Sequence, residues 1–344
     1  MLRARTRWSI SSPDPEAVRR LREALGAGPL LAALLAARGC TPEEAAFLLS
    51  DEYVFHDPFL LRGMAEAAAR IRGAIARGEP LLVYGDYDAD GVSAAALLAR
   101  LFRALGANFD VRVPHRHHDG YGLHARYLEE AAARGFRLVV TVDTGITAVA
   151  EAELARRLGI DLIITDHHEP HETLPDAFAV INPKRPDSAY PFRGLAGVGV
   201  AFKLAQALLG RVPEELAAYA AVGTVADLMP LTGENRSIVR LGLARIRAAP
   251  PLGLEALLRV SGIDRAGVTA GTLGFAVGPR INAGGRLDDA SDAVRLLVTD
   301  DAEEAGAIAR RLDALNRERQ RMVDEAAREA AAMVEAGGGP GDGI

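Results

Sequence analysis

Carboxylate and imidazole side chains gather in four short segments of this sequence, each of which follows an apolar run. The segments are residues 85–91 (GDYDADG), 142–145 (VDTG), 165–168 (TDHH) and 226–228 (ADL). Such runs are typical of buried strands in a parallel sheet, whose ligands gather outside the carboxyl ends of the strands. Acidic groups crowded there repel one another and lose solvation unless cations lie between them. The four segments together therefore predict a site in which two metal ions promote hydrolysis.

The first segment carries three aspartates at every second position. Asp86, Asp88 and Asp90 follow the run LLVY, and Gly91 opens the next predicted helix. A turn at this point lets the three carboxylates spread around one or two ions. A loop that is merely rich in Asp and Gly is the alternative, but this spacing directly after a strand favours a metal site. An EF-hand calcium loop is excluded, because a strand precedes the segment and the closing glutamate is lacking.

The other three segments carry fewer candidate ligands. Asp143, taken alone, predicts the N-cap of a helix that begins at the next residue. Asp227 stands in the apolar run VGTVADLMPL, where an unpaired carboxylate is costly and a cation is the simplest compensation. His167 and His168 by themselves fit a structural turn and a functional site equally well. Asp166 beside them favours a site, because a carboxylate orients an imidazole and raises its basicity as a metal ligand.

Three more segments are candidates for binding a substrate. Residues 114–122 (PHRHHDGYG) present Arg116 to a phosphate at the metal edge, and we expect an exposed, mobile loop rather than a histidine metal tract. Residues 278–286 (GPRINAGGR) predict a glycine-rich basic turn that either cradles phosphates through backbone N–H groups or joins two helices. We favour the phosphate role for this turn. Residues 194–199 (GLAGVG) are interpreted as a tight entry into a helix.

A parallel sheet is the element that would bring these segments together. Apolar runs recur from position 81 onward, with helical periodicity between most of them. The expected strands are 81–85, 109–113, 138–142, 161–165 and 178–181. The pattern predicts an α/β fold, a parallel β-sheet with helices on both faces, followed by a helical subdomain and a long connecting helix.

The rest of the chain is expected to be helical. Thr41, Pro42 and Glu44 predict a capped helix start within an alanine-rich N-terminal part. Further helices are expected at 197–210, 213–223, 234–248, 251–260, 288–299 and 301–336. The predicted domains are an N-terminal helical region at 1–80, an α/β metal-binding domain at 81–232, a helical subdomain at 233–300, and a connector helix with a glycine-rich tail at 301–344.

Composition limits the class of protein. The net charge of −6 argues weakly against a protein with a broadly basic surface for nucleic acid. It does not argue against a nuclease, because carboxylates that hold metal ions are counted in this sum without the positive charge of the ions. Cys40 is the single cysteine, which excludes an internal disulfide framework and fits a reducing cytoplasm. No apolar run reaches the ~20 residues that span a bilayer, so we expect a cytoplasmic protein with no membrane partner. Only Lys184 and Lys203 are lysines among 40 basic residues, a bias that we attribute to genomic base composition.

The motifs as a set resemble a known family. GDYDADG, PHRHHDGYGL, VTVDTGI, TDHH and VGTVADLMPL, in this order, are similar to motifs of the DHH phosphoesterase superfamily. PRINAGGRL and the long helix after it narrow the likeness to the RecJ single-strand-specific 5′→3′ DNA exonucleases. The likeness extends from about residue 50 to residue 336.

The resemblance implies a role for each matching residue. The implied metal ligands are Asp88, Asp90, Asp143, His167 and Asp227, with Asp143 bridging two ions and Asp86 supporting them. His168 would lie near the scissile phosphate and, with Arg280, stabilise its charge. The implied contacts to DNA or its 5′-phosphate are His115, Arg116, Tyr121, Arg280, Asn282 and Arg286. Two Mn²⁺ or Mg²⁺ ions are expected, and oxygen ligands with one imidazole suit Mn²⁺ slightly better.

The implied activity is metal-dependent hydrolysis of phosphodiester bonds in single-stranded DNA, with release of 5′-mononucleotides during DNA repair and recombination. Water activated between two cations needs no protein nucleophile. A channel too narrow for a duplex, with bases stacked on aromatic side chains, would select single strands, and Tyr121 is a candidate for this stacking. A single-strand-binding protein and a helicase are the partners that the resemblance implies.

Two alternatives stay open from the sequence. One is an oligoribonucleotide or cyclic-dinucleotide phosphodiesterase, or a pyrophosphatase, although such relatives tend to begin the first motif with histidine and lack PRINAGGR. The other is a catalytically weak scaffold.

RecJ proteins continue past the long helix into a domain with a glycine-rich motif ending in histidine, and often an OB-fold. This sequence lacks such a motif, since proline follows residues 337–339. This ending fits a fragment or a shortened gene product, and it leaves tight DNA binding and processivity open.

Overall fold

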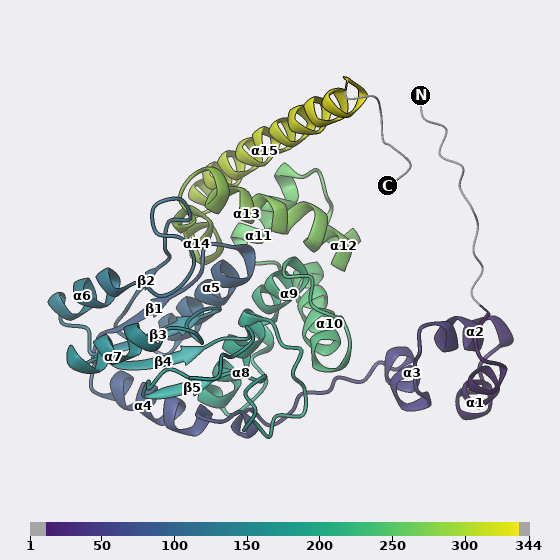
Figure 1. The fold of residues 1–344 in the computed structure, drawn as a ribbon, viewed down its shortest axis with the longest axis horizontal. Helices are drawn as coiled ribbons and strands as arrows, with labels where there is room; N and C mark the ends of the chain where they lie inside the picture. Colours follow the sequence, from purple (N-terminus) through teal and green to yellow (C-terminus); the bar gives the residue numbers. More distant parts are fainter. Residues whose placement is uncertain (1–11, 337–344) are drawn as a thin grey trace. The chain divides into compact units, whose positions relative to one another are not determined.

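The computed structural model describes residues 12–336, which form two compact units divided between residues 54 and 55 (Figure 1). The larger unit contains the sheet and all of the segments singled out above for chemistry. The fourfold division into domains stays a prediction. Its glycine-rich tail, residues 337–344, lies outside the described residues.

The smaller unit consists of three short helices, each of which has proline in its first turn. They are α1 (Pro15–Leu25), α2 (Pro29–Ala37) and α3 (Pro42–Leu49). The capped start predicted for α3 is confirmed, because the Thr41 hydroxyl accepts from the N–H of Glu44 and the Glu44 carboxylate accepts from the N–H of Thr41. A small core closes the unit and is made of Leu21, Ala32, Leu35 and Ala45.

The larger unit is organised by a five-stranded parallel sheet in the order β2-β1-β3-β4-β5. Its strands are β1 (Leu81–Tyr84), β2 (Phe109–Arg112), β3 (Leu138–Val142), β4 (Asp161–Thr165) and β5 (Ala179–Ile181). Each predicted strand is confirmed to within a residue at either end. The strand order reverses beside β1, and this is the point in an open parallel sheet where ligands bind. The segments after β1, β3 and β4 therefore meet at one edge.

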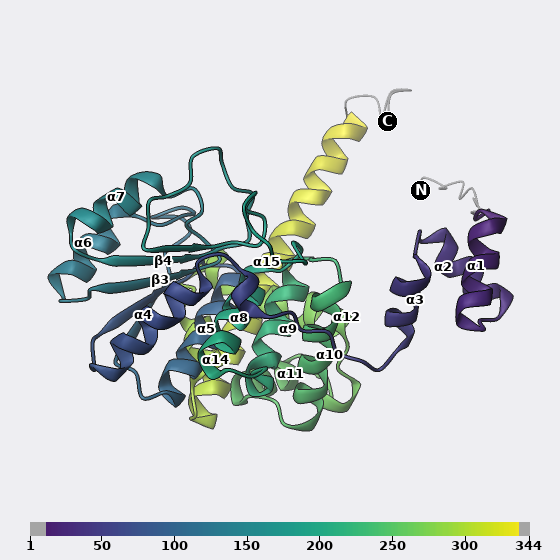
Figure 2. The same ribbon diagram turned by 90° about the horizontal axis from the view of Figure 1, so that it is seen from below.

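Helices cover both faces of the sheet, as the sequence predicted (Figure 2). The face of Leu81 and Val83 packs against α4 (Met64–Ala76), α5 (Ala89–Ala104) and α8 (Gly197–Leu209). The opposite face, with Leu82 and Tyr84, packs against α6 (Ala125–Ala133) and α7 (Val149–Arg157). Side chains of successive strand residues point to opposite faces, so that a fully apolar strand such as β1 needs cover on both sides.

The remaining elements of the larger unit are helical. The α-helices are α9 (Ala217–Ala226), α10 (Gly233–Ala248), α11 (Leu252–Val260), α12 (Ala270–Thr272), α13 (Gly278–Leu287), α14 (Ser291–Val298) and α15 (Ala302–Ala336). Short turns of other helix types are η1 (Pro58–Leu60), η2 (Glu214–Leu216), η3 (Arg265–Gly267) and the π-helical η4 (Leu273–Val277). Within α15, the buried residues lie in the first half, up to Asn316.

The turn predicted at residues 278–286 is wrong, because these residues form helix α13. Its glycines serve close packing rather than a turn. A Cβ at Gly285 would lie 2.3 Å from the carbonyl oxygen of Tyr87, and a Cβ at Gly284 would lie 3.0 Å from Leu312. The segment thus joins the loop after β1 to the long helix. Among residues 12–336, no helix is both long and apolar enough to cross a membrane.

Candidate metal centre

The loop between β1 and α5 holds its three aspartates in different directions. Asp88 is the N-cap of α5, and its carboxylate accepts from the N–H groups of Asp90 (2.9 Å) and Gly91 (3.1 Å). Gly91 lets the loop close on itself, because a Cβ there would lie 2.6 Å from Asp86. Asn282 of α13 supports the same loop by accepting from the N–H of Ala89 at 2.8 Å.

The carboxylate of Asp90 is held by the start of another helix. It accepts from the N–H groups of Gly197 (2.7 Å) and Val198 (2.8 Å), the first two residues of α8. The positive end of a helix dipole stabilises a carboxylate in this position. Residues 194–199 therefore form the predicted tight helix entry, and their N–H groups bind a side chain of the chain itself.

Asp143 is not a helix N-cap, contrary to the prediction made from its position alone. The next helix, α7, begins only at Val149, and Asp143 has a left-handed backbone with φ of 61°. This conformation is strained for a residue other than glycine and is often found at functional sites. The turn brings the carboxylate against the start of α8, where a Cβ at Gly197 would lie 2.4 Å from its Oδ1 atom.

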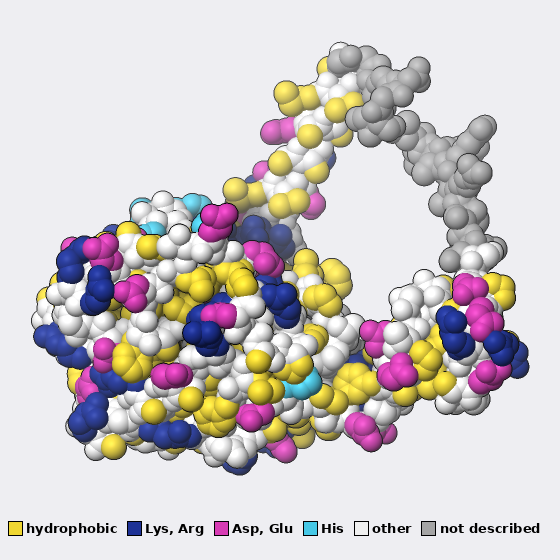
Figure 3. Space-filling model, turned by 60° about the horizontal axis from the view of Figure 1, so that its bottom comes forward, with side chains coloured by type: hydrophobic (Ala, Val, Ile, Leu, Met, Phe, Trp, Pro, Cys, Tyr) yellow, Lys and Arg dark blue, Asp and Glu magenta, His cyan; other side chains and the backbone are white. Residues whose placement is uncertain are grey.

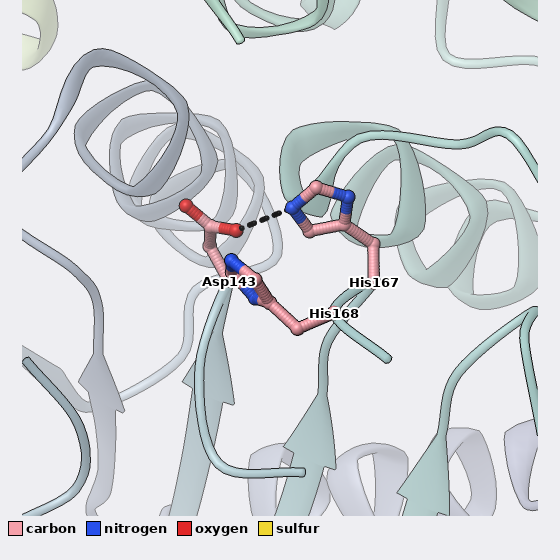
Figure 4. Close-up of side chains that lie close together, drawn as sticks. All are labelled: Asp143, His167 and His168. Atoms are coloured by element: carbon pink, nitrogen blue, oxygen red, sulfur yellow. Dashed lines mark ion pairs between the residues drawn. The ribbon is translucent and has the colours of Figure 1, made fainter. Parts of the chain in front are cut away.

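The separate clusters converge on His167, which follows β4. Its Nε2 atom lies 3.1 Å from Oδ1 of Asp143, 3.6 Å from Oδ2 of Asp227 and 3.8 Å from Oδ2 of Asp90. Figure 4 shows the carboxylate of Asp143 and the ring of His167 facing each other. The structure thus brings these distant segments together in one pocket, as predicted.

Three overlapping groups of side chains could each hold an ion, with ligand atoms within 4.8 Å of one another. The groups are Asp90, His167 and Asp227; Asp86, Asp88 and Asp143; and Asp143, His167 and His168. Asp143 and His167 each belong to two groups. An arrangement with shared ligands is what a pair of neighbouring ions requires.

The electrostatics of the pocket are unbalanced without cations. Burial, followed by the charge of a neighbouring aspartate, raises the pKa values of Asp90 and Asp143 well above the ordinary range. Burial and the charge of Asp88 raise the pKa of Asp86 to about 7 and that of Asp227 to about 6. Burial lowers the pKa of His167 to about 4, so its ring is neutral at neutral pH. Divalent cations would supply the missing positive charge.

Two buried oxygen atoms in this pocket lack hydrogen-bond partners, namely Oδ1 of Asp86 and Oδ1 of Asp143. Buried polar atoms normally have partners, and exceptions indicate a functional site or a bound ion. Carboxylate oxygens with one neutral imidazole are a donor set that suits Mn²⁺ and Mg²⁺. The residues present therefore fit two such ions.

Asp166 orients His168 rather than its neighbour. The fully buried carboxylate of Asp166 lies 2.7 Å from Nδ1 of His168 and also accepts from the N–H of Ile146 at 2.8 Å. The hydroxyl of Tyr121 lies 3.0 Å from the same Nδ1 atom. The hydrogen bond to Asp166 raises the pKa of His168, whose side chain is 45% exposed. His168 is thus a half-exposed, oriented imidazole at the rim of the pocket.

The loop 114–122 is anchored more firmly than an exposed, mobile loop would be. The buried carboxylate of Asp119 accepts from the N–H of His115 (2.7 Å) and from the hydroxyl of Tyr127 (2.7 Å). His117 reaches across to α13, with Nε2 2.7 Å from the carbonyl oxygen of Arg286. None of the candidate metal groups in residues 12–336 includes the histidines of this loop.

Arg116 is fixed at the edge of this loop. Its guanidinium lies 4.0 Å from the centre of the Tyr87 ring, and its Nε atom is buried without a hydrogen-bond partner. Stacking on an aromatic face fixes the plane of a guanidinium while leaving its edge available to a phosphate. The structure thus places Arg116 next to the loop that carries Asp86 and Asp88.

The guanidinium of Arg280 pairs with groups of the protein itself. Its Nε and Nη2 atoms lie 2.9 and 2.8 Å from Oδ1 of Asp313 in α15, and Nη1 donates to the carbonyl oxygen of Ala276 at 2.8 Å. No local pattern in the sequence signals the pairing with Asp313. Together with Asn282, Arg280 ties α13 to its surroundings, and contacts of these residues and Arg286 with a substrate stay a prediction.

Sequence reasoning did not single out Lys184 and Asn182, which follow β5 at the same edge. Asn182 is fully buried and donates to the carbonyl oxygen of His168 at 2.9 Å. The rarity of lysine in this chain was the one signal that marked Lys184.

On the face drawn in Figure 3, basic and acidic side chains are interspersed rather than gathered into one basic surface.

Comparison with known proteins adds independent findings. Residues 80–224 match the model of the DHH family, N-terminal domain. The chain is 48% identical over 337 residues to the single-stranded-DNA-specific exonuclease RecJ of Bacillus subtilis, and the match covers 97% of this chain and 43% of that protein. The chain therefore spans less than half the length of this relative.

Solved structures of RecJ proteins are also similar to this chain. A crystal structure of exonuclease RecJ bound to manganese is 41% identical, with a TM-score of 0.73, over 78% of this chain and 69% of the other. RecJ of Thermus thermophilus in complex with Mn²⁺ is 38% identical, with a TM-score of 0.81, over 95% of this chain and 48% of the other. The same Thermus protein in complex with Mg²⁺ matches with 34% identity and a TM-score of 0.71, over 95% of this chain and 45% of the other.

Proposed function

The chain belongs to the RecJ family of DHH proteins, and we propose that it is a metal-dependent exonuclease that degrades single-stranded DNA in the 5′→3′ direction and releases 5′-mononucleotides. The observation that carries this proposal is the convergence of buried, uncompensated carboxylates on His167 at the carboxyl edge of the sheet. The names of the relatives supply the substrate class, single-stranded DNA. Their likeness favours this substrate over a dinucleotide.

The proposed ligands of two Mn²⁺ or Mg²⁺ ions are Asp88, Asp90, Asp143, His167 and Asp227. When bound, such ions lower the pKa of a water molecule and stabilise negative charge on phosphoryl oxygens. Asp143, which belongs to two of the candidate groups, is the proposed shared ligand. Asp86, which belongs to the same candidate group as Asp88 and Asp143, is proposed to support the ions through its carboxylate.

His168 and Arg116 are proposed to bind the substrate phosphates. The raised pKa of His168 favours the charged imidazolium, which Asp166 holds at the rim of the pocket. A positive group held in advance near the reacting phosphate stabilises charge that develops during hydrolysis. Arg116, stacked on Tyr87, is proposed to hold the terminal 5′-phosphate or the backbone next to it. Tyr121 at the same rim is the proposed surface for stacking of a base.

A role in DNA repair and recombination, with a single-strand-binding protein and a helicase as partners, belongs to the same proposal. We also propose a cytoplasmic location, which fits a DNA substrate and the single cysteine of the chain.

Asp143→Ala tests the proposal most simply. We expect the wild-type chain with Mn²⁺ to release mononucleotides from a long single strand but not from a duplex, and to act poorly on a dinucleotide. Asp143→Ala should abolish this release, because both ions would lose a ligand. The matched control is Asp176→Ala, which changes an aspartate that is 80% exposed and lies beside the start of β4 rather than its end. Full activity of the Asp143 variant, or equal cleavage of the dinucleotide, would contradict the proposal.

A further inference from the structure

The two lysines of this chain are informative because the other residues among its 40 lysines and arginines are all arginines. Lys203 shows surroundings that suit a lysine. Its Nζ atom is buried and donates to the carbonyl oxygen of His56 (2.6 Å), to Gln206 (2.5 Å) and to Glu234 (2.7 Å). Three acceptors grouped around one point suit a compact ammonium and not a planar guanidinium. The surroundings of Lys203 thus suit a small positive charge.

Lys184, the other lysine, lies in the loop after β5 at the carboxyl edge of the sheet. Its backbone is fixed on both sides, because its N–H donates to Oδ1 of Asn182 (2.7 Å) and its carbonyl oxygen accepts from Arg193 (2.7 Å). The amide of Asn182 also donates to the carbonyl oxygen of His168 at 2.9 Å. One buried asparagine therefore ties the backbone of Lys184 to the loop that carries the two histidines of the pocket.

The side chain of Lys184 contrasts with its fixed backbone. Its Nζ atom lies 3.1 Å from Oε1 of Glu169; the side chain of Lys184 is 23% exposed and that of Glu169 is 81% exposed. Because water surrounds the carboxylate of this pair, the pair contributes little to stability, and the ammonium can exchange it for a stronger partner. The ammonium therefore contacts the residue that directly follows His167 and His168 in the chain.

We propose that Lys184 is a substrate-binding residue, whose ammonium leaves Glu169 to bind a phosphate of the single strand that lies across the metal centre. This inference rests on the proposed function. A phosphate offers several charged oxygens to a lysine, which acts as a point charge and follows a phosphate that moves as nucleotides are removed. Glu169 competes with the substrate for the ammonium and keeps it at the edge of the pocket when no strand is bound.

Opposite effects of two variants separate this role from a structural ion pair. If the pair only stabilised the loop, Lys184→Met and Glu169→Gln would weaken DNA binding alike. If Lys184 binds phosphate, Lys184→Met should weaken binding about tenfold, whereas Glu169→Gln should strengthen it about twofold to threefold. Lys184→Arg should retain part of the affinity. The matched control is Arg156→Met, which removes an exposed, ion-paired charge on α7, where the loss should change nothing.

The measurement is fluorescence anisotropy of a short, 5′-phosphorylated oligodeoxythymidylate, with Ca²⁺ in place of the catalytic ion, followed by hydrolysis of the same strand with Mn²⁺. Equal affinity of wild type and Lys184→Met, or weaker binding by Glu169→Gln, would overturn the inference even if the wild type degrades the strand. Opposite shifts in affinity without any hydrolysis would support the inference and overturn the proposed exonuclease. A wild type that neither binds nor hydrolyses the strand would overturn both.

Discussion

Two clusters of buried charge in the larger unit, one around Glu234 and one around His167, differ in how that charge is balanced. Around Glu234, a fully buried carboxylate accepts from Lys203, from the hydroxyl of Tyr190 and from the N–H of His56. In the pocket around His167, the buried carboxylates lie beside one another and beside a neutral imidazole, and His168, which favours a positive charge, is half-exposed at the rim. A balanced cluster stabilises a fold, whereas an unbalanced one has to be completed by something that binds.

The balanced cluster also has a clear structural task. Lys203 belongs to α8, Glu234 to α10, and His56 to the first residues of the larger unit. The hydrogen bonds of the cluster hold these three elements together without any ion. The unbalanced cluster uses the same helix, α8, through the N–H groups of Gly197 and Val198 that donate to Asp90. One helix thus supports a structural cluster at its side and a binding site at its start.

Removing the positive charge of the balanced cluster should cause the largest loss of stability. Lys203→Met leaves the carboxylate of Glu234 buried without its cation, so we expect the free energy of unfolding to fall by about 3–5 kcal/mol. The double variant Lys203→Met, Glu234→Leu should regain most of this loss. Urea unfolding monitored by circular dichroism measures both. A loss below about 1 kcal/mol for the single variant would show that this cluster is not balanced in the way described.

Removing a negative charge from the unbalanced cluster should have the opposite sign. Asp143→Asn relieves repulsion within the metal-free pocket and places a residue that tolerates φ of 61°. We expect the metal-free chain to gain about 1–2 kcal/mol of stability, while saturating Mn²⁺ stabilises the wild type more than the variant. Thermal unfolding with EDTA and with Mn²⁺ provides the comparison. Destabilisation of the metal-free variant would mean that Asp143 serves the fold alone.

The pH dependence of stability is a smaller and complementary effect. Asp86 and Asp227 have pKa values of about 7 and about 6, above their ordinary value of 3.8, so the folded chain binds more protons than the unfolded chain between about pH 4 and 7. Its stability should therefore fall as the pH rises through this window. His167 acts in the opposite direction, since its pKa is lowered to about 4. The raised pKa values of Asp90 and Asp143 outweigh this single histidine.

Unfolding in EDTA across this pH range measures the slope, and Mn²⁺ supplies the contrast. Ions that bind the ionised carboxylates should reverse the fall in stability toward neutral pH. The variant Asp86→Asn should flatten the slope of the metal-free chain. A metal-free stability that rises steadily from about pH 4 to 7 would contradict the raised pKa values.

The sequence predicted the sheet and the meeting of its polar segments because both depend on local patterns. Apolar runs defined each strand, and carboxyl ends of parallel strands share one edge. Prediction from the sequence failed where the conformation of a residue depends on a partner far away in the chain. The position of Asp143, taken alone, predicts an N-cap. In the structure its backbone is left-handed, and its carboxylate lies against Gly197 in α8. The segment 278–286 was assigned to a turn, yet Gly285 is required by the close approach of Tyr87.

Asp166 and Arg280 show the same limit within the site. The carboxylate of Asp166 was expected to orient a neighbouring imidazole, but the sequence could not tell His168 from His167. The pairing of the Arg280 guanidinium with Asp313 in the long helix was not predicted, and contact of Arg280 with a substrate stays a prediction. Pairings between residues far apart in the chain leave no periodic trace, so they emerge only from the three-dimensional structure.

Anomalous diffraction from crystals grown with Mn²⁺ tests the two-ion pocket most directly. We expect two manganese peaks, one in contact with Asp90, His167 and Asp227, the other with Asp88, and Asp143 in contact with both. Both peaks should therefore weaken or vanish in Asp143→Ala crystals. A pocket that stays free of manganese at saturating concentration, while its carboxylates remain as close as they are here, would contradict the claim that this cluster is completed by metal ions.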